Sequence, residues 1–198
     1  MSETYSIVVV AAGMGGISAL GSLLQHLPPN YDGAILVALR FEGQPPNIVL
    51  EILQSYSSVP LGYARDGTHL KPRMVFLAPL SHHLLMRAPN VLSLEPGGSG
   101  DNLVPSADHL FASAAAVYGR RVVGVVLSGR SHDGTKGLED IEAAGGVGIV
   151  QLPETAGSPE MPSAAIRNDH PNYCLPVPQI AALLARLPLD KGNRSFSS

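Results

Sequence analysis

The stretch IVVVAAGMGGISAL, residues 7–20, decides the fold class. Its β-branched run predicts a strand over 7–11, its glycines predict a tight turn, and its apolar residues from Ile17 onward follow helical spacing. A strand, a glycine turn and a helix in this order are typical of the first unit of a parallel sheet. Such a turn often carries a phosphate loop or a nucleophile, yet residues 12–16 have no reactive side chain.

Short apolar runs alternate with helical patterns along most of the remaining chain. This alternation predicts an α/β fold with a doubly wound, Rossmann-like and mostly parallel sheet, covered by helices on both faces. The later predicted strands are 34–39, 59–64, 122–127 and 147–151, and the predicted helices are 17–27, one starting near Pro46, 106–118 with Ser106 as N-cap, 136–144 and 177–187.

The middle of the chain has a different pattern. Residues 73–98 alternate apolar runs with turn residues at short spacing and leave no room for a crossover helix. They predict an antiparallel hairpin, as an insertion or an edge of the sheet, with residues 88–90 at its turn. We expect loops at 97–105 and 152–162, because both segments are rich in glycine, proline and small polar residues.

Composition limits the function classes. A length of 198 residues favours one domain over 1–190, and the polar segment 191–198 predicts a disordered tail. A net charge of −3 without a clustered basic face argues against a nucleic-acid partner. No apolar run is long enough for membrane insertion and the first residues lack a basic leader, so we expect a cytoplasmic protein. The single cysteine, Cys174, excludes an intrachain disulfide.

The turn and the loop after the second predicted strand allow two interpretations. AAGMGG, residues 11–16, is a near match to the dinucleotide fingerprint, and Arg40 follows the second strand where an NADP-type protein holds a 2′-phosphate. The other interpretation is that Gly15 and Gly16 only allow a helix to pack closely against a strand. Both remain open from the residues alone.

Asp133 is the most conspicuous charged residue of the third loop, SGRSHDGT, residues 128–135. A carboxylate there could orient a histidine, bind a metal or cap the helix that begins near Thr135. We expect His132 to lie at the surface, and one of His82 and His83 to be packed inside. No histidine and carboxylate spacing matches a zinc helix motif, so neither a metal nor another cofactor is expected.

Six stretches in order resemble the catalytic domain of the bacterial chemotaxis methylesterase family CheB. The similarity runs from about residue 7 to residue 187, and its order along the chain is that of the family. The stretches are AAGMGG (11–16), ALRF (38–41), DGTHLKPRMVFLAPLSHHLLM (66–86), PSADHLF (105–111), LSGRSHDGTKGLEDIEAAGGVGIVQ (127–151) and EMPSAAI (160–166).

The resemblance implies a fold known to hydrolyse glutamyl methyl esters on chemoreceptors with a serine, a histidine and an aspartate, releasing methanol. Carried over by position, the nucleophile is replaced by Gly13 and the base by Leu39, and only the aspartate survives, as Asp133. Arg130 stands where the family has a methionine. Because the first predicted strand begins at residue 7, we expect no counterpart of the family's receiver domain. We therefore expect an inactive binding or regulatory module whose partner is a chemoreceptor cytoplasmic domain or another signalling protein.

Three further expectations follow. Gly13, Leu39 and Asp133 should converge at the carboxyl edge of the sheet. An active hydrolase would need a relocated site around Asp133, with Ser18 or Ser131 as the nucleophile. The lost active site could instead form an anion-binding cleft, unless Arg40 pairs with Glu42 or Asp133. Its residues would be Arg40, Arg130, His132, Gly15 and Gly16, at the amino end of the first helix.

Overall fold

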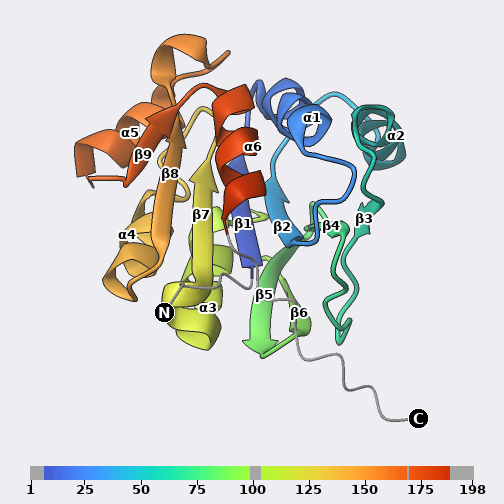
Figure 1. The fold of residues 1–198 in the computed structure, drawn as a ribbon. Coiled ribbons are helices and arrows are strands. Elements are labelled where there is room, and N and C mark those ends of the chain that lie inside the picture. The colour runs from blue at the N-terminus through green and yellow to red at the C-terminus, as the bar shows by residue number, and fades with distance from the viewer. Residues whose placement is uncertain (1–6, 99–103, 169, 188–198) are drawn as a thin grey trace.

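A seven-stranded sheet forms the centre of the protein (Figure 1). The computed structural model describes residues 7–98, 104–168 and 170–187. The strand order is β3-β4-β2-β1-β7-β8-β9, and every neighbouring pair is parallel. The strands are β1 (Ile7–Ala12), β2 (Ala34–Leu39), β3 (Leu61–Tyr63), β4 (Met74–Leu77), β7 (Val122–Val126), β8 (Val147–Gln151) and β9 (Tyr173–Leu175).

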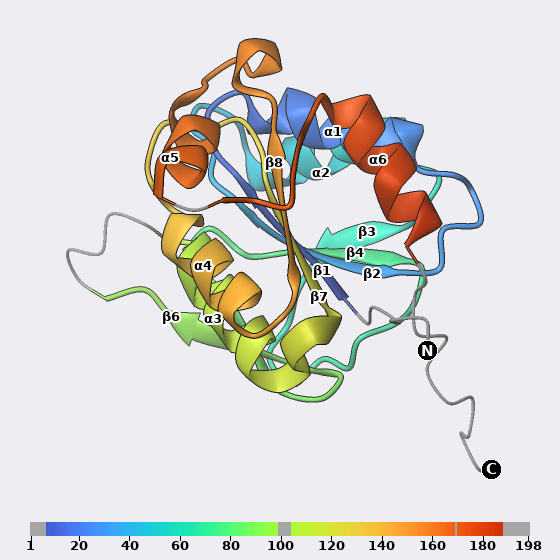
Figure 2. The same ribbon diagram turned by 60° about the vertical axis from the view of Figure 1, so that its left-hand side comes forward.

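Helices cover both faces of this sheet, which confirms the predicted doubly wound α/β fold (Figure 2). One face carries α1 (Gly16–His26), α2 (Pro46–Tyr56) and α6 (Val177–Arg186); the other carries α3 (Ala107–Tyr118), α4 (Thr135–Ala143) and α5 (Glu160–Asn168). Two short 3₁₀ turns occur at Gly119–Arg121 and Pro153–Thr155. Each helix within the described ranges is too short or too polar to cross a bilayer.

The central strands are buried on both faces, so their residues divide between two cores. Val8 and Val10 of β1 pack toward α1, whereas Val9 and Ala11 pack toward α3. This division follows from the two-residue period of a strand, which sends successive side chains to opposite faces. It also explains why these strands are continuous apolar runs.

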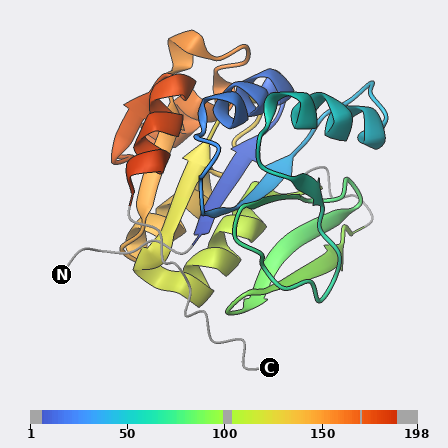
Figure 3. The same cartoon turned by 45° about the vertical axis from the view of Figure 1, so that its right-hand side comes forward.

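A separate antiparallel hairpin lies beside α3, set apart from the main sheet (Figure 3). It consists of β5 (His82–Ala88) and β6 (Val91–Pro96), with the turn where the sequence predicts it. Asn90 has a positive φ of 63° in this turn, and its side chain accepts a hydrogen bond from the Tyr118 hydroxyl at 2.9 Å. The end of α3 therefore fixes the hairpin turn.

Two parts of the prediction are wrong. β4 does not belong to the hairpin but runs parallel to β3 in the main sheet. Residues 64–73 connect these two strands without a helix. Within this connection, His69 forms an isolated antiparallel β-bridge with Val91 of the hairpin. The end of the predicted loop 152–162 already lies in α5. Pro162 is tolerated there because it lies in the first turn, where the backbone N–H has no helical partner.

Two expected segments fall partly or wholly outside the described residues. The predicted loop 97–105 includes 99–103, and the predicted tail is 191–198. The observed fold neither supports nor contradicts these two predictions.

Candidate functional site

The loops after β1, β2 and β7 meet at the carboxyl edge of the sheet. The order of the strands reverses here, because β1 lies between β2 on one side and β7 on the other. Backbone hydrogen bonds join the loops: Gly13 N donates to Ser128 O and Arg40 N donates to Ala12 O, both at 2.9 Å. Ligands of open α/β sheets bind at such a switch point, so this edge is the candidate site.

Gly13 lies in the predicted place, directly after β1, and is buried. A Cβ atom at this position would lie 3.2 Å from Gly129 Cα and 3.4 Å from Met161 Sδ. A side chain here would therefore point toward the loop after β7. The position itself supplies no reactive side-chain atom to this edge of the sheet.

Gly15 and Gly16 have steric reasons to be glycine. Gly15 has a φ of +74°, and a Cβ there would lie 2.6 Å from Ser128 Oγ. A Cβ on Gly16 would lie 2.8 Å from the Cβ of Ala12. Both distances are shorter than non-bonded carbon contacts allow. The close approach of α1 to the sheet thus accounts for this turn without a bound phosphate.

Ser128 holds the loops of this edge together, a role that sequence reasoning missed. It is fully buried, and its hydroxyl donates to Met14 O at 2.8 Å and accepts from Ser158 N at 2.9 Å. Its own N–H donates to Gln151 Oε1 at 2.9 Å. The turn after β1 and the loop after β8 are therefore both tied to the first residues of the loop after β7.

Leu39 does not contribute its side chain to the site, which corrects the carry-over from the family. Its backbone ends β2 at the expected edge, but its side chain is buried in the core beneath α1 and α2. Strand alternation explains the difference, since the next residue points to the opposite face, where α3 begins. Arg40 therefore faces Asp133, and Leu39 does not.

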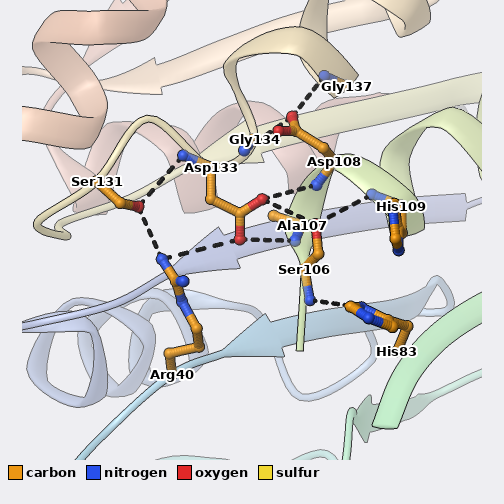
Figure 4. A network of polar contacts seen from close by, with 10 residues as sticks. All are labelled: Arg40, His83, Ser106, Ala107, Asp108, His109, Ser131, Asp133, Gly134 and Gly137. Carbon is orange, nitrogen blue, oxygen red and sulfur yellow. Dashed lines mark hydrogen bonds and ion pairs between the residues drawn. The ribbon is translucent and has the colours of Figure 1, made fainter. Parts of the chain in front are cut away.

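Arg40 is partly buried between the loops after β2 and β7 (Figure 4). Its Nη2 atom donates to Ser131 Oγ at 2.7 Å and lies 3.9 Å from Asp133 Oδ2. Of the two pairings considered for Arg40, the structure contains the one with Asp133. The guanidinium is thus directed inward, away from any separate anion-binding cleft.

Asp133 is buried and caps a helix other than the predicted one. Its carboxylate accepts from Ser106 Oγ at 3.0 Å, from Ala107 N at 2.9 Å and from Asp108 N at 3.0 Å. These groups form the amino end of α3, where Ser106 is the predicted N-cap and also accepts a bond from the backbone. The interpretation that Asp133 caps the helix beginning near Thr135 is wrong, because Gly134 is the N-cap of α4 and provides no side chain.

Asp108 caps α4 in its turn. Its Oδ1 atom accepts from Gly134 N at 3.0 Å and from Gly137 N at 2.7 Å. Burial raises the pKa of the Asp108 carboxyl above its ordinary value, and the nearby Asp133 charge acts in the same direction. The two helix starts are therefore linked by a reciprocal pair of aspartates.

His83 is the packed member of the histidine pair, as expected from strand alternation, and His82 lies nearer the surface. His83 Nδ1 accepts a hydrogen bond from Ser106 N at 3.2 Å, and its ring centroid lies 4.3 Å from that of His109. His83 thus supports the amino end of α3 from the hairpin side.

Arg130 and His132 are exposed, as expected of His132, and face a shallow cavity of about 460 Å³. Arg167 of α5 joins them there, although nothing in the sequence pattern singled it out. The predicted anion cleft is thus divided, because Arg40 pairs with Asp133 while Gly15 lines a second cavity of about 360 Å³ between α1 and α6. The first cavity is lined by Arg130, Ser131, His132, Pro159, Glu160, Ser163 and Arg167.

The described residues contain no cluster of three histidine, cysteine, aspartate or glutamate side chains able to hold a metal ion. The polar groups of the edge are instead arginine, serine, histidine and helix-capping aspartate. Such groups can bind anions or hydrogen-bond a partner.

By its fold, the protein is a doubly wound α/β domain whose candidate site lies at the carboxyl ends of β1, β2 and β7. The chain belongs to the CheB methylesterase family, whose model matches residues 8–184. It is 32% identical over 189 residues to a putative protein-glutamate methylesterase/protein-glutamine glutaminase of Leptospira interrogans, covering 96% of this chain and 97% of that protein.

Two comparisons with Thermotoga maritima give the same result. Its protein-glutamate methylesterase/protein-glutamine glutaminase is 30% identical over 187 residues, which cover 91% of this chain and 54% of that protein. The crystal structure of the Thermotoga maritima CheB methylesterase catalytic domain matches with a TM-score of 0.86 at 30% identity, covering 93% of this chain and all of that one (100%). The chain thus spans about half the length of that methylesterase and the whole of the solved catalytic domain.

Proposed function

We propose that this methylesterase-fold domain does not hydrolyse esters and acts as a binding or regulatory module in chemotaxis-type signalling. The observation that carries the proposal is the contact between Arg40 and Asp133, together with a glycine at position 13. In a serine hydrolase these three places would hold the base, its orienting carboxylate and the nucleophile.

Neither half of the acyl-transfer chemistry has a side chain to perform it. Gly13 has no oxygen to attack a carbonyl carbon. Arg40 cannot act as a general base, because a guanidinium remains protonated in proteins and has no acceptor atom.

Asp133 does not need a catalytic role to explain its presence. Its carboxylate accepts three hydrogen bonds at the amino end of α3, in addition to the Arg40 contact. A buried carboxylate with these donors stabilises the helix start on its own.

The two alternative functions receive less support. Ser131, the candidate for a relocated nucleophile, accepts from Arg40 and from Asp133 N, and its hydroxyl forms no hydrogen bond with a histidine of the described residues. For dinucleotide binding, Arg40 would have to leave Asp133 to reach a 2′-phosphate, and Gly15 already packs against Ser128. The relatives named protein-glutamate methylesterases act on protein side chains, so we propose a protein partner, a chemoreceptor cytoplasmic domain or another signalling protein.

A fluorophosphonate probe followed by intact-protein mass measurement tests this proposal. The probe labels serines that a base activates, so the wild-type chain should show no adduct. The Thermotoga maritima catalytic domain serves as the positive control under the same conditions. A stoichiometric adduct on Ser131 or Ser18 that disappears in Asp133→Asn would overturn the proposal and favour a relocated hydrolase site.

A further inference from the structure

We infer that the cavity between the loop after β7 and helix α5 binds a carboxylate carried by an acidic segment of a protein partner. Two arginines and one histidine, Arg130, Arg167 and His132, line this cavity of about 460 Å³. One carboxylate, Glu160, opposes them. The balance of charge in the lining is positive, although the whole chain has a net charge of −3.

The two arginines reach the cavity from two different elements. Arg130 and His132 flank Ser131 in the loop after β7, while Ser163 and Arg167 lie one turn apart on α5. Residues three or four positions apart share a helix face, so Glu160 lies on the same face of α5. An incoming carboxylate can therefore be contacted from both sides of the cavity.

The two arginines are available for a ligand. Neither Arg130 nor Arg167 forms an ion pair or a side-chain hydrogen bond in the described part of the chain, and both are exposed. A guanidinium binds a carboxylate with two parallel N–H donors, and the hydroxyls of Ser131 and Ser163 offer further donors beside it. Arg40, by contrast, is already engaged by Asp133.

The exposure of the lining favours a ligand on a protein surface over a free metabolite. Binding sites for free small molecules enclose most of the ligand within a largely apolar pocket. Here most of the lining is solvent-exposed, including both arginines, so an acidic side chain could enter while the partner's surface stays outside. The exposed lining residues are Arg130, His132, Pro159, Glu160 and Arg167.

This inference rests on the proposed function only in naming a protein partner, and neither of its two arginines takes part in the loss of catalysis. The two can therefore fail separately. Methanol release by the wild-type chain from a methylated receptor domain would remove the proposed function and would leave open whether the two arginines bind a carboxylate. Loss of carboxylate binding would remove the cavity's role and leave an inactive domain.

The test uses calorimetric titration with two synthetic helical peptides of equal length, one with glutamates four residues apart and one with glutamines in their place. We expect the glutamate peptide to bind roughly tenfold more tightly, and Arg130→Ala/Arg167→Ala to remove that difference. Arg65→Ala/Arg186→Ala is the matched control, because it removes two exposed arginines that do not line the cavity.

Glu160→Gln gives a prediction of opposite sign. Removing the one carboxylate of the lining should strengthen binding of the glutamate peptide by roughly twofold to fivefold. Equal affinity for the two peptides, or an unchanged affinity in Arg130→Ala/Arg167→Ala, would overturn the inference. If sodium acetate at the same carboxylate concentration displaced the glutamate peptide, the ligand would not need to be part of a protein. The cavity would then be a general site for free anions.

Discussion

Asp133 caps the helix that begins beside Asp108, and Asp108 caps the helix that begins beside Asp133. The Asp133 carboxylate accepts from Asp108 N at 3.0 Å, and the Asp108 carboxylate accepts from Gly134 N at 3.0 Å. Each carboxylate thus accepts a hydrogen bond from the backbone at the start of the helix that lies beside the other aspartate. These bonds hold the amino ends of α3 and α4 together. The aspartate that the resemblance assigns to catalysis is thereby also a structural residue.

Removing the Asp133 carboxylate should destabilise the protein strongly. Asp133→Ala leaves Ser106 Oγ, Ala107 N and Asp108 N without their acceptor, so we expect a loss of about 2–4 kcal/mol in the free energy of unfolding. Asp133→Asn keeps one acceptor oxygen and should lose less. Urea unfolding followed by circular dichroism measures both, and a neutral Asp133→Ala variant would contradict the capping role.

Asp108 should make stability depend on pH. Burial raises its pKa in the folded protein above the unfolded value of about 3.9, so protonation favours the folded state. Its contribution is fully present below about pH 4 and is lost as the pH rises through the folded pKa. Asp108→Asn removes this titration but keeps an acceptor for the amides of Gly134 and Gly137.

We therefore expect Asp108→Asn to gain unfolding free energy relative to wild type between pH 4 and pH 7, and to match wild type at lower pH. Urea midpoints at several pH values measure the difference. The opposite result would be an unfolding free energy of Asp108→Asn that falls further below that of wild type as the pH rises. It would mean that the charged carboxylate stabilises the start of α4 by more than its burial costs.

The turn after β1 should tolerate no side chain at Gly15. Gly15→Ala combines a φ of +74° with a Cβ placed 2.6 Å from Ser128 Oγ. Gly43→Ala is the matched control, because Gly43 has a φ of +77° and nothing within 4 Å of a Cβ. The control should lose about 1–2 kcal/mol from backbone strain alone. Thermal unfolding should show a clearly larger loss for Gly15→Ala, and equal losses would refute the packing interpretation of the turn.

Arg40 should contribute modestly to stability through its contacts with Ser131 and Asp133. Its side chain is 20% exposed, and Asp133 keeps three other donors, so Arg40→Ala should cost about 0.5–1.5 kcal/mol. Arg65→Ala, an exposed arginine, should stay within about 0.5 kcal/mol of wild type. A gain in stability on losing Arg40 would show that its burial costs more than its contacts return.

Buried periodic segments were predictable from the sequence. Strands β2 and β8 have the predicted bounds, because short and mostly apolar runs between turn residues are typical of strands inside a parallel sheet. Helix α5 was missed because prolines at 159 and 162 indicate a loop, whereas at a helix start they are tolerated. The three-residue strand β9 has too short a pattern to be recognised.

The candidate site was predictable only in part. Arg130 and His132 were placed at the correct edge, since loops after parallel strands share it. The inward orientation of the Arg40 side chain could be predicted from strand alternation, because Leu39, the residue before it, packs into the core on the opposite face of the sheet. The reciprocal capping by Asp108 and Asp133 was not, because it depends on how α3 packs against α4, and no local pattern records that contact.

Methanol release from a methylated chemoreceptor cytoplasmic domain tests the central claim most directly. The measurement compares the wild-type chain with buffer, with Asp133→Asn, and with the Thermotoga maritima catalytic domain as the active control. We predict that the wild-type chain and Asp133→Asn both release methanol at the rate of buffer alone, since Gly13 and Arg40 supply neither a nucleophile nor a base. Wild-type release well above buffer, lost in Asp133→Asn, would contradict the account and show that this domain is an active methylesterase.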